Sequence, residues 1–504
     1  MIGFARIKKN VYILISHGIV ARLLNLLQPI LIAFYIGTSM STDTYFLAFS
    51  ATMLLTKILT EGMLVSSIPI YQQIDKRDGM KGRVEFTNNL LNTYSILGLI
   101  LVILGIIFAP LIIRIFGPGF TGEMFDQSVK LFRIGAPILF FDIIRIIGSG
   151  YLQSIHAFKA GAKSGIAYNL VYIIYLLFFS QYFGVEGLMV AGIVAIISQI
   201  FILWKPVFKG GYSYKFHLLL KDRLLIRFHT FMFPILLGVG VNEVNLIIDN
   251  AIGSTLRTGT VAELNYANDI ISFFVTWIIV ALVTAIFPVI SQRFRDDDPE
   301  TIKKSFLYSL RIMIVVSIPL AILFMTLAEP LVRLFFQRGE FSYEDTIATA
   351  SILRYYAPSI IGMSLMLLLN RIFYAVHSVT TPVVIGILGL VSNAVLSLIF
   401  ARYLGSVGIA LGTTLSVILV TLYAIIKLNL IYKIFTFKNA IVSLSKIIVA
   451  GISMAATILY LNEQFGGILE VSDIGNILVV ILSAVCGLAV YTLVSRLLKV
   501  SEGD

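Results

Sequence analysis

The sequence LFFQRGEFSYEDTIATASILRYYAPSIIGMSLMLLLNRIFYAVHSVTTP occupies residues 334–382. It contains a short amphipathic turn, a long apolar helix and a small polar loop before a proline. The same order occurs earlier in the chain. Three pairs of segments correspond: Gly119-Phe120 with Gly339 to Phe341, Ala136-Pro137 with Ala357-Pro358, and His156 with His377. The last two pairs share an offset of 221 residues. This repetition predicts two copies of one helical bundle.

The composition places the chain in the membrane. Hydrophobic residues make up 58% of the 504 residues, charged residues only 13%, and the mean hydropathy is +0.94. A soluble protein of this size carries about a quarter charged residues, so we predict an all-α integral membrane protein. The net charge of +11 is explained by cytoplasmic loops rich in lysine and arginine rather than by nucleic acid binding. A single cysteine, Cys486, excludes an internal disulfide and a cysteine metal site.

Apolar runs of about 20 residues, the length needed to cross a bilayer, predict about fourteen transmembrane helices. Their approximate ranges are 11–37, 45–72, 89–113, 130–154, 163–182, 185–207, 230–256, 264–290, 305–328, 347–374, 382–402, 406–433, 440–461 and 474–497. The loops alternate between cation-rich and cation-poor along the chain. This alternation and an even helix count predict that both termini are cytoplasmic.

The repeat predicts the domain organisation. We expect a six-helix lobe at 1–208, a cytoplasmic interfacial linker at 209–229, a second six-helix lobe at 230–435 and two additional helices at 436–504. The linker is basic and aromatic, which favours an interfacial helix on the cytoplasmic leaflet, with a flexible linker as the alternative.

Ionisable residues inside the predicted spans are the candidate site residues, because a charge near the bilayer centre costs at least a few kcal/mol. The candidates for substrate binding are Arg22, Asp43, Lys57, Glu61, Arg145 and Arg371, and those for ion coupling or cavity lining are Glu243, Asp249 and Asp269. Arginine binds phosphate at two points, so several cations in one cavity indicate an anionic or diphosphate-bearing substrate.

Several of these candidates have an alternative explanation, whereas Arg22 and Arg371 have no acidic residue within four positions. Lys57 with Glu61, and Asp142 with Arg145, are spaced as ion pairs within one helix, where they would only stabilise structure. Asp43 and Asp269 would be hydrated if they lie near the external interface. No phosphate-binding loop, metal spacing or Ser-His-Asp order is present, so we expect a transporter without a cofactor rather than an enzyme.

The second half of the chain resembles the MurJ (MviN) lipid II flippase family, within the MATE-like and polysaccharide exporter (MOP) superfamily. The residues that carry the resemblance are Leu334 to Phe341, Asp345-Thr346, Arg371 to Ala375, Thr380 to Pro382, Asn242 to Leu256, Leu264 to Ala267, Phe287 to Ser291 and, more loosely, Arg22 to Leu24, Ile36-Gly37, Asp43 and Thr60 to Gly62. The resemblance spans about residues 10–435.

The resemblance implies two six-helix lobes around a cationic cavity, with two C-terminal helices forming a groove for a lipid tail. It also implies alternating access that moves a polyprenyl-diphosphate saccharide from the inner to the outer leaflet. Arg22, Asp43, Lys57 and Glu61 are the positions carried over from the family. The chain departs from the family pattern at Gln28-Pro29, where the family has Arg-Asp, and at Asp269, where the family has an arginine.

The expected function is therefore transport of an undecaprenyl-diphosphate-linked cell-wall precursor, lipid II or similar, across the bacterial cell membrane. Membrane potential or an ion gradient would drive it. Expected partners are this lipid and membrane lipids, without nucleic acid, for a monomer that could work beside cell-wall synthesis enzymes. The alternatives are an exopolysaccharide or O-antigen repeat-unit flippase, a MATE-type cation-coupled exporter with coupling ions at Asp249 and Asp269, and a membrane-bound glycan polymerase or ligase.

Overall fold

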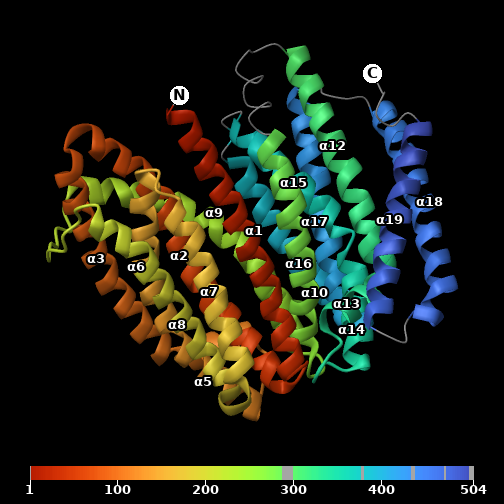
Figure 1. The fold of residues 1–504 in the computed structure, drawn as a ribbon, viewed down its shortest axis with the longest axis horizontal. Helices are drawn as coiled ribbons and strands as arrows, with labels where there is room; N and C mark the ends of the chain where they lie inside the picture. Colours follow the sequence, from red (N-terminus) through yellow and green to blue (C-terminus); the bar gives the residue numbers. More distant parts are fainter. Residues whose placement is uncertain are drawn as a thin grey trace. The chain divides into compact units, whose positions relative to one another are not determined.

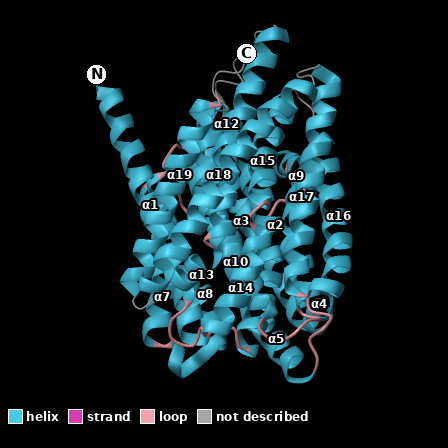
Figure 2. Cartoon of the chain, turned by 90° about the vertical axis from the view of Figure 1, so that its right-hand side faces the viewer, coloured by secondary structure: helices cyan, strands magenta, loops and turns pink. Residues whose placement is uncertain are grey.

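The computed structural model describes residues 2–286, 299–375, 378, 380–432, 437–469 and 473–498. Within these ranges it leaves out the side chains of residues 2–17, 237–243, 299–302, 374–375, 431–432, 437–444, 466–469 and 473–474. His377 and the segment 287–291, both used in the sequence comparisons, lie outside the described residues. The described part of the chain consists of helices and connecting loops and contains no strand (Figure 2).

The described chain forms two compact units, Met1–Ala262 and Glu263–Asp504 (Figure 1). The first contains α1 (Ile2–Ile36), α2 (Met40–Arg77), α3 (Gly79–Ile107), α4 (Ala109–Phe116), α5 (Gly122–Gly135), α6 (Pro137–Ser154), α7 (Lys159–Phe178), α8 (Ser180–Lys209) and α9 (Arg223–Gly253). From α10 onward the helices are α10 (Thr260–Phe274), the π-helix η1 (Val275–Ile279), α12 (Pro299–Thr326), α13 (Ala328–Phe336), α14 (Tyr343–Tyr356), α15 (Ser359–Ala375), α16 (Thr380–Leu404), α17 (Ser406–Tyr432), α18 (Phe437–Leu469) and α19 (Asp473–Leu497).

Helix α9 groups with the first unit, because it packs against α2, α3 and α4. The division by contacts therefore falls after α9, whereas the sequence repeat places this helix at the start of the second lobe. The four-part organisation read from the repeat remains a prediction.

The prediction of an all-helical membrane protein is confirmed. Among the described residues, eleven helices are long and apolar enough to cross a membrane, and the bent pair α14 and α15 brings the number to twelve. The exact count of fourteen is not confirmed. The two predicted spans outside this set are 130–154, where α6 carries Asp142 and Arg145, and 230–256, part of whose side chains are not described.

The repeat is visible in two matching corners of the chain. In the first unit, a short helix α4 is followed by a loop, a 14-residue helix α5 and then α6, which begins with Pro137. In the second unit, the short helix α13 is followed by the 14-residue helix α14 and by α15, with Pro358 at the break and a bend of 45°. Proline breaks both helices because it has no backbone N–H and collides with the preceding turn.

In each corner an arginine donates a hydrogen bond to a carbonyl near the end of the preceding long helix. Arg133, in the last turn of α5, donates from Nε to the carbonyl of Ile106 at 3.2 Å, and Arg354, in the last turn of α14, donates to the carbonyl of Met325 at 3.3 Å. Both acceptors are among the last carbonyls of a long helix, which have no partner inside that helix. The two corners therefore share this tertiary contact as well as their order of helices.

The segment between α8 and α9 differs from the predicted interfacial helix. Residues 212–219 are irregular, and asparagine side chains of α3 hold them. Asn89 accepts from the backbone N–H of Leu219 at 2.8 Å and donates to its carbonyl at 3.0 Å. Asn88 and Asn92 donate to further carbonyls of the segment. These amides satisfy backbone groups that a helix would otherwise pair internally, so the helix prediction is wrong and the segment is anchored.

Candidate functional site

The candidate site is a pocket of about 310 Å³ inside the first unit, between α2, α6, α7 and α8. Its lining residues are Met53, Thr56, Lys57, Thr60, Glu61, Asp142, Arg145, Ile146, Tyr168, Ile196 and Gln199. The α2 residues follow one another at intervals of three, one, three and one positions, which puts them on one face of the helix. The pocket thus joins a polar stripe of α2 to polar side chains from three other helices.

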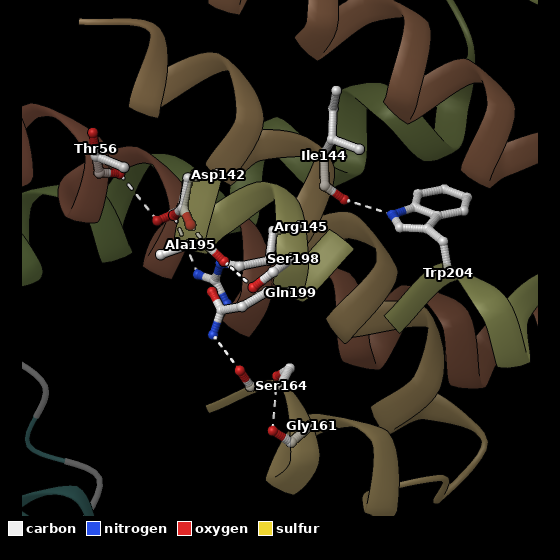
Figure 3. A network of polar contacts seen from close by, with 11 residues as sticks. Thr56, Asp142, Ile144, Arg145, Gly161, Ser164, Ala195, Ser198, Gln199 and Trp204 are labelled. Atoms are coloured by element: carbon white, nitrogen blue, oxygen red, sulfur yellow. Dashed lines mark hydrogen bonds and ion pairs between the residues drawn. The ribbon is translucent and has the colours of Figure 1, made fainter. Parts of the chain in front are cut away.

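Asp142 and Arg145 form an ion pair within this polar set (Figure 3). Arg145 binds the carboxylate at two points, from Nε to Oδ1 and from Nη2 to Oδ2, the latter at 3.2 Å. The side chain of Asp142 is 9% exposed and that of Arg145 is 22% exposed. Asp142 uses two of the five guanidinium N–H groups, so it fixes the plane of Arg145 and leaves three N–H groups for other acceptors.

The uncharged polar residues of the pocket offer both hydrogen-bond acceptors and donors. The hydroxyls of Thr56 and Thr60 donate to carbonyls one turn earlier on α2, at 2.8 and 3.0 Å. Gln199 donates one of its two amide N–H groups to the carbonyl of Ser164 on α7 at 3.3 Å (Figure 3). The two threonine oxygens and Oε1 of Gln199 therefore keep lone pairs that can accept hydrogen bonds.

The helices around the pocket are fixed by contacts that do not line it. Trp204 on α8 donates from its indole nitrogen to the carbonyl of Ile144 on α6 at 3.0 Å (Figure 3). Its ring is buried and packs at a tilt against Phe208 and edge-on against Tyr212. This contact holds α6, which carries Asp142 and Arg145, against α8, which carries Gln199.

Asp43 has a different environment from the pocket residues. It lies in the first turn of α2, is 1% exposed, and accepts from the backbone N–H groups of Gly259 at 2.6 Å and Ala262 at 2.8 Å. Gly259 directly precedes α10 and has no side chain with which to cap that helix. Asp43 supplies the missing cap, since a carboxylate satisfies free N–H groups at a helix start and interacts favourably with its dipole.

The structure places the other sequence candidates as follows. Lys57, Glu61 and Arg145 lie together in the pocket lining. Arg22 is exposed on α1 and Asp249 is buried on α9, and neither lines the pocket. In the second unit, Asp269 on α10 and Arg371 on α15 are half-buried. The side chain of Glu243 lies outside the described residues. Their roles in binding or coupling remain predictions.

Sequence reasoning missed several lining residues. Thr56, Thr60, Tyr168 and Gln199 were not predicted, because the search was for charges and these side chains are neutral. Gln199 carried a usable signal, since it is a polar residue within a strongly apolar helix. Asp142 was recognised only as a partner for Arg145, and the structure adds that the pair faces a cavity. No group of three or more His, Cys, Asp or Glu able to hold a metal occurs among the described residues.

Comparisons with known proteins agree with this architecture. The family model described as lipid II flippase MurJ matches residues 32–479. The "Probable lipid II flippase MurJ" of Buchnera aphidicola subsp. Acyrthosiphon pisum is 29% identical over 407 residues, covering 79% of each chain. A protein of the same description from Thermotoga maritima is 25% identical over 491 residues, covering 96% of this chain and 94% of the relative.

Solved structures show the same fold. A lipid II flippase MurJ in an inward closed conformation has a TM-score of 0.77 at 24% identity, with 96% of this chain and 100% of that chain covered. An inward-facing multidrug resistance MATE family transporter of the MOP superfamily has a TM-score of 0.70 at 18% identity, with 84% and 99% covered. The resemblance predicted from the sequence is thereby confirmed, and the chain belongs to the lipid II flippase MurJ family.

Proposed function

We propose that this chain is a lipid II flippase, which moves an undecaprenyl-diphosphate-linked cell-wall precursor from the cytoplasmic to the outer leaflet by alternating access. The observation that carries the proposal is the match of the lipid II flippase MurJ model to residues 32–479, nearly the whole chain. The set of apolar helices long enough to cross a membrane supports it. The alternative functions, exopolysaccharide flippase and MATE-type exporter, are less well supported, because the family model that matches this chain is that of the lipid II flippase.

The substrate is expected to make two kinds of contact. Its diphosphate requires cations, and we assign this role to Lys57, Arg22 and Arg371, which lie within apolar helices. Lys57, Glu61 and Arg145 contact the substrate at the pocket of the first unit. We also assign substrate binding to Asp43, which bonds to the backbone at the start of α10.

The energy for transport comes from the membrane potential or an ion gradient acting on charges in the membrane, where about 2.3 kcal/mol is available per charge per 100 mV. We assign coupling to Glu243, Asp249 and Asp269. The protein needs no cofactor and catalyses no covalent step. It works in the bacterial cell membrane with both termini in the cytoplasm, as a monomer that acts beside cell-wall synthesis enzymes.

The test is rescue of a bacterium that has been depleted of its own lipid II flippase. The chain should restore growth, and labelled lipid II should reach the outer leaflet. Failure by a protein that is expressed and inserted would refute the proposal and favour an exporter of another lipid-linked glycan.

Arg22→Ala should abolish rescue without loss of insertion. Arg402→Ala is the matched control, because Arg402 is also an exposed arginine on a membrane helix but lies in its last turn. Full rescue by Arg22→Ala would show that Arg22 does not bind the substrate.

A further inference from the structure

Helix α7 contacts α1 on one face and the pocket on another. Gly165 and Asn169, four positions apart, lie on the face toward α1, whereas Tyr168 lines the pocket between α2, α6, α7 and α8. The two helices are close at this point, because a Cβ added to Gly165 would lie 3.6 Å from the Cβ of Ala21 on α1. Helix α7 therefore connects α1 with the pocket (Figure 1).

The side chain of Asn169 joins the two helices by hydrogen bonds. It is 5% exposed, and its Nδ2 atom donates to the carbonyl of Ala21 at 3.1 Å and to that of Gly165 at 2.9 Å. Both N–H groups of the amide are thereby used. The Oδ1 atom of Asn169 is buried and has no hydrogen-bond partner in the described part of the chain. An unpaired buried oxygen lowers stability, so the stability of the fold does not by itself explain an asparagine at this position.

The carbonyl of Ala21 belongs to the peptide unit that leads into Arg22, one of the cations assigned above to the diphosphate. A peptide unit is planar and rigid, so a hydrogen bond to this carbonyl also restrains the backbone N and Cα atoms of Arg22. The guanidinium lies at the end of a long side chain, and a rotation of α1 would move it farther than the backbone. Binding groups must be held within about 0.5 Å of their productive positions, so an arginine on a helix that can rotate would bind a diphosphate less well.

We propose that Asn169 is a positioning residue for transport, which holds the peptide unit before Arg22 against α7 and so fixes this arginine relative to the pocket. The inference rests on the proposed function, since it concerns how one of the cations assigned to the diphosphate is held. Asn169 is buried between α1 and α7 and does not contact the substrate. Its whole effect on binding therefore passes through Arg22.

The test is a double-mutant cycle on the purified full chain, with the affinity for undecaprenyl diphosphate as the measured quantity. Arg22→Ala should weaken binding about ten- to a hundredfold, the effect of one charge-assisted hydrogen bond. Asn169→Leu keeps the branched shape of the side chain and removes its N–H groups. It should weaken binding about three- to tenfold, because a displaced arginine keeps part of its attraction for the diphosphate. The double variant should bind within about twofold of Arg22→Ala alone, since Asn169 has nothing left to position.

Asn476→Leu is the matched control. Asn476 on α19 is also 5% exposed, and its Nδ2 atom also donates to a carbonyl of another helix at 3.1 Å, that of Pro330 on α13. This variant should lower the unfolding temperature by about as much as Asn169→Leu and leave the affinity unchanged within about twofold. Thermal unfolding of each variant confirms that the protein is folded. Asn169→Ala replaces Asn169→Leu if the latter does not fold, because the smaller side chain cannot collide with α1.

The outcomes separate this inference from the proposed function. Unchanged affinity in a folded Asn169 variant, or an equal loss in Asn476→Leu, would overturn the inference and leave the proposed function standing. Full additivity of the losses in the double variant would also overturn it, because Asn169 would then act without Arg22. Wild-type protein that binds neither lipid II nor undecaprenyl diphosphate would refute the proposed function, and the inference with it.

Discussion

Replacing Asp43 by alanine removes both hydrogen bonds that join the start of α2 to the start of α10. The carboxylate is 1% exposed and its two acceptor distances are 2.6 and 2.8 Å, within the range of charge-assisted bonds. Each such bond contributes about 1.5–3 kcal/mol. The side chain of alanine offers no replacement, so the N–H groups of Gly259 and Ala262 lose their partner.

The expected loss of unfolding free energy is about 3 kcal/mol, the lower end of the sum of two such bonds, because the backbone at a helix start can relax. For a domain of this size, 1 kcal/mol shifts the unfolding temperature by about 2–4 °C, so Asp43→Ala should unfold roughly 6–12 °C below wild type. Asp43→Asn keeps one oxygen acceptor and should lie between the two.

The assay is thermal unfolding of the purified protein in detergent, together with transport in cells. Asp126→Ala is the control, since Asp126 is an exposed aspartate on α5, and it should unfold with wild type. The capping argument would be wrong if Asp43→Ala unfolded within about 1 °C of wild type. Loss of transport by Asp43→Asn at unchanged stability would instead support the substrate-binding role expected from the sequence.

Two further predictions concern the hydrogen bonds between Asn89 and Leu219 and the ion pair between Asp142 and Arg145. Asn89→Ala removes both hydrogen bonds to Leu219, so limited trypsin digestion should cut the segment 212–219 at Lys215 faster than in wild type, and an unchanged rate would show that the asparagine does not anchor it. Asp142→Asn and Arg145→Gln should each cost about 2–3 kcal/mol of unfolding free energy, below the ~3–5 kcal/mol of a fully buried pair because Arg145 is partly exposed. The double variant should lose less than the sum of the two, and strict additivity would mean that the pair is not coupled.

The sequence by itself determined the class of the protein and its local architecture. Hydropathy predicted the membrane helices because each span must satisfy its own backbone hydrogen bonds in lipid, which makes the signal local. The Ala-Pro pairs at residues 136–137 and 357–358 were recognised as part of the repeat, but the predicted spans 130–154 and 347–374 ran through them without a break, although proline interrupts a helix at its own turn. The family resemblance was also readable, because its motifs are short and contiguous.

Spacing along one helix predicted part of the site as well. Asp142 and Arg145 are three residues apart on α6 and form the ion pair that the sequence suggested. Lys57 and Glu61 are four residues apart and line the same pocket. The sequence could not show that these two pairs, from different helices, share one cavity, because helical periodicity gives only the face of a helix and not its neighbour.

Only the tertiary structure decided which distant groups meet. Asp43 binds Gly259 across 216 residues, and Asn89 binds Leu219 across 130. Gln199 on α8 lines the pocket, and Trp204 on the same helix bonds to Ile144 on α6. A hydrogen bond between such groups forms only when their helices pack side by side. Helix packing results from many weak contacts spread over the whole unit, so no periodic pattern in the sequence predicts it. The local rules therefore predicted the helices and the charges, and the packing determined the cap, the anchored loop and the chemistry of the pocket.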